Sequence, residues 1–83
     1  NYDKAIELYE LYWELTANKK PRYTDALEAM AIIYEIQKKY DKSIHTYQRL
    51  ISCLKEEWGY NDDDSVVIQT NLKIQNIQNK KFK

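Results

Sequence analysis

The segment Tyr2-Asp3-Lys4-Ala5-Ile6 returns 38 residues later as Tyr40-Asp41-Lys42-Ser43-Ile44. Each copy is followed, three residues on, by a tyrosine, Tyr9 or Tyr47. The turn sequence at 37–40 has a counterpart at 78–82, which makes the next interval 42 residues. Repeats of this period are typical of helical units that stack on one another, because a single unit cannot bury its own apolar face. The repetition therefore predicts a stacked helical chain that offers a surface to a partner.

The composition favours one small all-α domain. In 83 residues, 43% are apolar and 31% are charged, with a single Gly and a single Pro, which indicates long helices with few breaks. Thirteen basic and thirteen acidic residues cancel, so no overall charge attracts nucleic acid or an anionic membrane. No apolar run reaches the roughly 18 residues that span a bilayer. One cysteine, with no disulfide framework, favours a cytoplasmic location.

Apolar spacing of three and four residues predicts about four helices, at 2–18, 24–39, 41–58 and 64–80. Pro21 ends the first helix, because it lacks an N–H and disfavours helix at the residue before it. Thr24 suits the N-cap of the second helix, and Asp63, Asp64 or Ser65 suits that of the fourth. Gly59 is expected in the left-handed conformation after the third helix.

The residues that could carry chemistry are too few and too scattered for catalysis. His45 is the only histidine, and Cys53 lies among apolar neighbours with no base in pattern with it. The acidic loop 61–64 lacks the ligand spacing and the distal Glu of an EF-hand. A single Gly cannot build a phosphate-binding loop. We therefore expect no enzyme activity, no metal site and no cofactor.

The pattern resembles the tetratricopeptide repeat (TPR) family. Its signature places a large residue, Leu, a small residue and Tyr at fixed spacing on one helix, then a small residue and an aromatic on the next. Leu27-x-x-Met30-Ala31-x-x-Tyr34 matches the first part, and Ser43-x-x-x-Tyr47 the second. Ala5-x-x-x-Tyr9 repeats the second part alone. The resemblance implies antiparallel helix-turn-helix units stacked as a right-handed α-solenoid, of which residues 1–83 would be a fragment.

The stretch from Tyr40 to Leu72 is similar to the long repeat variant of kinesin light chains and of bacterial peptide-sensing regulators. There the second helix of a repeat ends in Gly and continues through an acidic loop into a helix rich in Asn and Leu. Here Gly59, the run 62–64 and Thr70-Asn71-Leu72 follow that order. The last helix aligns with the signature in two registers, which place either Leu72 or Asn71 at the Leu position.

The resemblance implies a ligand groove lined by the first helix of each repeat, here 24–39 and 64–80. The peptide-binding positions would be Asp25, Glu28, Ile32, Glu35, Gln69, Asn71, Lys73 and Asn76. Asn and Gln side chains both donate and accept hydrogen bonds, which suits pairing with a peptide backbone. Glu28 and Glu35 would repel a C-terminal carboxylate, so we expect the acidic and apolar groove to prefer a basic peptide.

In the predicted repeats, the helix at 2–18 is a second helix without its first, and the helix at 64–80 is a first helix without its second. Each therefore lacks a neighbouring helix on one side. Both would expose enough apolar surface to need cover. We expect either a fragment of a longer solenoid or self-association through these end helices. The function predicted is a scaffold that binds a protein or peptide. Two alternatives stay open: a purely structural or self-associating segment of a larger protein, and the sensor segment of a regulator that responds to a signal peptide.

Overall fold

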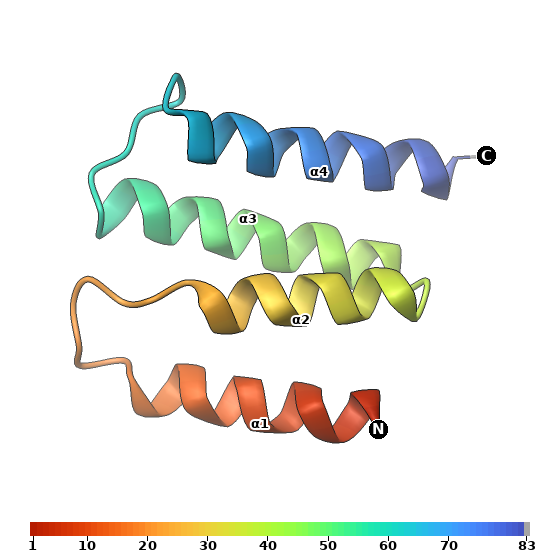
Figure 1. Ribbon diagram of the computed structural model, residues 1–83, viewed down its shortest axis with the longest axis horizontal. Helices are drawn as coiled ribbons and strands as arrows, with labels where there is room; N and C mark the ends of the chain where they lie inside the picture. The colour runs from red at the N-terminus through yellow and green to blue at the C-terminus, as the bar shows by residue number, and fades with distance from the viewer. Residues whose placement is uncertain (83) are drawn as a thin grey trace.

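The computed structural model describes residues 1–82, and these residues form four α-helices and no strand. The helices are α1 (Tyr2–Leu15), α2 (Asp25–Ile36), α3 (Tyr40–Glu56) and α4 (Ser65–Lys81). They run alternately in opposite directions, and each lies beside the helix that precedes it in the chain (Figure 1). The body is flat, with extents of 38 × 34 × 14 Å. The all-α class and the number of helices are as the sequence predicts.

The helix ends follow from local chemistry. Thr24 and Asp64 occupy the N-cap positions of α2 and α4, as expected, although neither side chain bonds its own helix. The Asp64 carboxylate instead accepts a hydrogen bond from the Asn61 N–H at 2.6 Å, which closes the loop before α4. Helix α1 ends at Leu15, three residues earlier than predicted, with Thr16 at its C-cap. The next N–H, of Ala17, donates to the Glu14 carbonyl three residues back at 3.2 Å, which tightens the chain out of the α-helix.

Helix α2 ends at Ile36. Two residues further on, Lys38 adopts the left-handed conformation, at φ +61°, and prevents the helix from continuing. Its N–H donates to the Glu35 carbonyl at 2.9 Å, and the Lys39 N–H donates to the Tyr34 carbonyl at 2.8 Å. These two bonds are those of a Schellman motif, in which the left-handed residue is usually glycine. Lysine at this position gives no signal in the sequence, which is why the predicted helix runs on to residue 39. Gly59, by contrast, has the expected left-handed conformation, at φ +74°.

The core lies where α2, α3 and α4 meet. Its buried side chains include Leu27 and Met30 from α2, Tyr47 and Leu50 from α3, and Ile77 from α4. No residue of α1 is fully buried. That helix reaches the core only through side chains that are partly buried, Ile6 and Trp13.

Two small residues let α2 and α3 approach closely, and these two helices share the most extensive contact in the fold. Ala31 and Ser43 are both completely buried. The Ser43 hydroxyl donates to the Ala31 carbonyl at 2.7 Å, so the only polar atom of the pair is satisfied. A larger residue at either position would force the two helix backbones apart.

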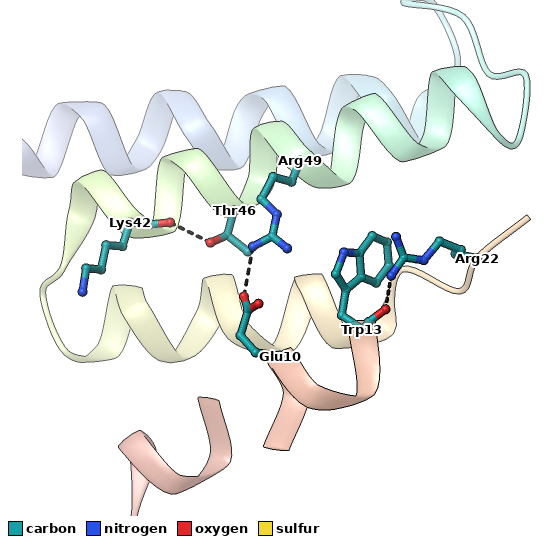
Figure 2. A network of polar contacts seen from close by, with 6 residues as sticks. All are labelled: Glu10, Trp13, Arg22, Lys42, Thr46 and Arg49. Carbon is teal, nitrogen blue, oxygen red and sulfur yellow. Dashed lines mark hydrogen bonds and ion pairs between the residues drawn. The ribbon is translucent and has the colours of Figure 1, made fainter. Parts of the chain in front are cut away.

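Ion pairs connect helices that are two apart in the chain, α1 with α3 and α2 with α4. Glu10 of α1 and Arg49 of α3 form an ion pair at 3.0 Å (Figure 2). Glu28 of α2 pairs with Lys73 of α4 in the same way. These pairs tie α1 to α3 and α2 to α4 across the flat body of helices.

Arg22 fixes the loop between α1 and α2. Its guanidinium lies 3.4 Å from the centre of the Trp13 ring and donates to the Trp13 carbonyl (Figure 2). The Arg22 N–H donates to the Glu57 carboxylate at 3.0 Å, and its carbonyl accepts from the Trp58 indole N–H at 2.7 Å. One residue thus joins the end of α1 to the end of α3. The sequence gives no signal for this role, because all three partners are distant in the chain or bond through the backbone.

Candidate functional site

A hollow lies between α2 and α4. Its volume is about 390 Å³, and its walls are Glu35 of α2 and Lys73, Asn76, Asn79 and Lys80 of α4. Three of these residues belong to the predicted peptide-binding set. Asn79 and Lys80 do not, although Lys80 stands seven residues after Lys73, as Glu35 stands seven residues after Glu28. That matched spacing is the signal in the sequence that could have found Lys80.

Two ion pairs join α2 to α4 here, one between Glu35 and Lys80, which both line the hollow, and one beside it between Glu28 and Lys73. Glu28 and Lys73 are 3.9 Å apart, and Glu35 and Lys80 are 2.5 Å apart. Seven residues make two helical turns, so both pairs lie on the facing sides of the two helices. The hydrogen bond to Glu35 is the main cause that raises the pKa of Lys80 above its usual value. Because a lysine faces each glutamate, the surface is neutral, and the prediction of an acidic surface is wrong.

Tyr47 of α3 lies behind the two pairs. Its side chain is 2% exposed, and its ring centre is 5.9 Å from the Lys73 ammonium. Burial raises the pKa of Tyr47 to about 12, and the charges of Glu35 and Glu28 act in the same direction. The hydroxyl therefore stays protonated at any physiological pH. It adds a neutral, rigid support to the site and no acid–base chemistry.

The predicted site residues divide between the hollow, the exposed surface of α2 and two further hollows. Glu35, Lys73 and Asn76 line the hollow, and Glu28 lies next to it through its ion pair with Lys73. Gln69 lies on the same side of α4, four residues before Lys73. Ile32 is 41% exposed on α2, outside the lining of the hollow.

Asp25 and Asn71 lie elsewhere. Asp25 lines a second hollow of about 370 Å³ between α1 and α2, together with Leu8, Tyr9, Tyr12 and Ala26. Asn71 lines a third, of about 400 Å³, on the other side of α4. Its neighbours there are Ile68, Leu72, Ile74, Gln75 and Gln78.

Both end helices expose apolar side chains, as the repeat phase predicts. On α1 these residues are Tyr2, Leu8, Tyr9, Leu11, Tyr12 and Leu15. On α4 they are Val66, Ile68 and Leu72. The two surfaces lie at opposite ends of the stack of helices (Figure 1).

The remaining reactive residues are placed as expected. Cys53 is buried, and burial followed by the charge of Glu57 raises the pKa of its thiol, which makes it a poor nucleophile. His45 is exposed on α3. Within residues 1–82 no group of three or more His, Cys, Asp or Glu is arranged to hold a metal ion. None of the helices described is both long and apolar enough to cross a bilayer.

Comparisons with protein-family models, with curated proteins and with solved structures found no match to this chain.

Proposed function

We propose that the chain is a TPR-like protein-interaction segment that binds an extended peptide in the hollow between α2 and α4. The observation that carries the proposal is the pair of carboxamides, Asn76 and Asn79, in a hollow walled by two helices. Each carboxamide donates and accepts, as a peptide group does. The resemblance to tetratricopeptide repeats supports the same surface, because that family binds ligands along the equivalent helices.

The charges of the hollow favour recognition of backbone over recognition of charged side chains. A ligand carboxylate that bound Lys73, or a ligand cation that bound Glu28, would have to break the ion pair between these two residues. Each gain is offset by the loss of the pair already present. Since Glu28 and Lys73 are both about half exposed, their pair is weak and opens at little cost. The preference for basic peptides expected from α2 alone is therefore small.

The size of the hollow limits the ligand. About 390 Å³ is enough for one or two side chains and the backbone between them. The ligand class is thus a short extended segment of a protein, held by its peptide groups. A folded domain would need additional contacts on the exposed surface around Ile32.

Asn71 supplies a matched control for the test. The chain would be screened against an array of short peptides, and the affinity of each binder measured by fluorescence anisotropy. Asn76→Ala should weaken binding about tenfold, because it removes one or two hydrogen bonds to the ligand. Asn71→Ala removes the same group from the other side of α4 and should leave binding unchanged. Equal effects of the two variants, or an array without any binder, would contradict the proposal.

A further inference from the structure

The side of α1 that faces away from the core carries a row of leucines. Ile6 and Trp13 mark the side of α1 that packs on the core. On the opposite side, spacings of four, three and four residues align one lysine and three leucines, and they are Lys4, Leu8, Leu11 and Leu15. The three leucines are between 51% and 74% exposed. This is the spacing at which one helix packs along another in a coiled coil, so the row suits a helix of a partner.

Tyr12 extends this row toward α2. Together with Leu8 and Tyr9 it forms the α1 wall of the hollow of about 370 Å³ between α1 and α2. Asp25 and Ala26 line the same hollow from α2. A large side chain of a docked helix can enter this hollow while its neighbours pack on the leucines. We call the leucine row together with this hollow the α1 strip.

Acidic side chains stand at both edges of the α1 strip. Glu7 and Glu14 each precede a leucine of the row, and their separation of seven residues puts both on one edge. Asp25 lies at the other edge, in the wall of the hollow. All three residues are exposed, and none of them forms an ion pair within residues 1–82. The α1 strip is therefore apolar along its length and has unpaired negative charge on both sides.

The outer helices of a second copy do not supply the opposite charge. Helix α1 carries four acidic residues and one lysine, so two α1 helices would repel each other. The three lysines of α4 already form ion pairs within their own copy, with Glu28, Glu35 and Asp41. The cations that match the edges of the α1 strip therefore have to come from a different protein.

We propose that the α1 strip binds an amphipathic helix of a different protein. That helix carries aliphatic residues at intervals of three and four, with Lys or Arg at the flanking positions. Its aliphatic residues cover the leucine row, and its cations pair with Glu7, Glu14 and Asp25. The hollow of the peptide-binding proposal is a separate surface, because its lining residues all belong to α2 and α4. The inference therefore stands independently of that proposal.

Three synthetic peptides of about 20 residues, long enough to form a helix, provide the test. The first has leucines at intervals of three and four with lysines beside them, and the second has glutamates in place of the lysines. The third has the composition of the first in scrambled order. The affinity of each for the chain is measured by fluorescence anisotropy. The lysine peptide should bind at least about tenfold more tightly than either of the others. If the lysine peptide does not bind, or if either of the others binds as tightly, the proposal is wrong.

Charge reversal tests the edges of the α1 strip. Glu7→Lys combined with Glu14→Lys should invert the preference, so that the glutamate peptide binds more tightly than the lysine peptide. Both positions are exposed and unpaired, so the fold should be retained, and circular dichroism checks the helix content. A double variant that still prefers the lysine peptide would overturn the proposal.

Variants with a shortened apolar surface locate the bound peptide. Leu11→Gln should weaken binding of the lysine peptide about tenfold, because it removes an apolar contact at the centre of the row. Ile32→Gln makes a similar change on the exposed surface of α2 and should leave the affinity unchanged. Asn76→Ala should also leave it unchanged, and a loss of binding there would place the peptide between α2 and α4 and contradict the inference.

Sedimentation velocity separates a different protein from a second copy as the occupant. The unmodified chain should sediment at the mass of the 10.0 kDa monomer at every concentration used for the anisotropy measurements. Self-association that Leu11→Gln abolishes would show that a second copy covers the α1 strip, and the proposal would then be wrong.

Discussion

Replacement of Lys38 by glycine should stabilise the fold. Lys38 is the only residue other than glycine with a positive φ in residues 1–82, at +61°, and it occupies the position at which a Schellman motif favours glycine. Its side chain is exposed, so the change tests the backbone with little effect on packing. The two hydrogen bonds of the motif, from the N–H groups of Lys38 and Lys39, do not involve the side chain and are retained.

The expected gain is the difference between two opposing terms. A left-handed conformation costs an L-residue roughly 1–2 kcal/mol, and glycine removes that cost. Glycine also gives the unfolded chain more freedom, which costs about 0.5–1 kcal/mol. The free energy of unfolding should therefore rise by about 0.5–1 kcal/mol. For a chain of this size, with a urea m-value near 1 kcal/mol/M, the midpoint of urea unfolding should rise by about 0.5–1 M.

Lys19→Gly is the matched control. Lys19 is also an exposed loop lysine, but its φ is not positive, so glycine relieves no strain there. That variant should lose about 0.4–1 kcal/mol through the entropy term alone. The two variants should move the midpoint in opposite directions, with the m-value unchanged. If Lys38→Gly lowers the midpoint as much as Lys19→Gly does, the assignment of strain to Lys38 is wrong.

Three further predictions concern the core and the loop. Ser43→Leu should destabilise by about 1–3 kcal/mol or prevent folding, whereas Ser43→Ala should cost only about 1 kcal/mol in urea melts, because Ala5 already serves at the equivalent position. Tyr47, whose pKa rises from 10.0 to about 12 on folding, holds its proton more tightly in the folded state. Its contribution to the free energy of unfolding is therefore complete below pH 10 and is lost as the pH rises from 10 to 12. At pH 11 the loss should be about 1.4 kcal/mol relative to pH 9, and Tyr47→Phe should lack that component. Arg22→Ala should lower the free energy of unfolding by about 1–3 kcal/mol, through the lost contact with Trp13 and the lost hydrogen bond. Arg22→Lys should recover less than half of this, because an ammonium lacks the planar face, and full recovery would show that charge alone matters.

The elements that depend on local sequence could be predicted well. Four helices, the Thr24 N-cap and the left-handed Gly59 all follow from spacing and from the conformational preferences of single residues. The close contact of Ala31 and Ser43 follows from two small residues at repeated positions. The end of α2 could not be predicted, because Lys38 adopts a conformation that its residue type disfavours.

The site was predicted only in part, because its geometry depends on how α4 is rotated against α2. Helical spacing places Lys73 and Asn76 on one side of α4, but it does not say which side faces α2. The sequence therefore grouped Asn71 with Asn76, and the structure separates them. It also treated Glu28 and Glu35 as free acids, since their lysine partners follow 45 residues later. The Arg22 contacts were missed for a similar reason, because the partner groups are mostly backbone atoms or lie beyond residue 50.

The absence of any fully buried residue in α1 has a consequence for the order in which the fold opens. Helices α2 and α3 hold most of the buried side chains, and α1 is attached through Ile6, Trp13 and the polar contacts of Glu10 and Arg22. Detachment of α1 exposes little surface that is buried in the folded chain, so it needs less free energy than global unfolding. Backbone amides of α1 should therefore exchange with deuterium first and those at the α2–α3 contact last. The monomer would then be a stable pair of central helices with a gradient of protection toward α1, and any molecule that covers α1 would slow its exchange before it changes that of the centre.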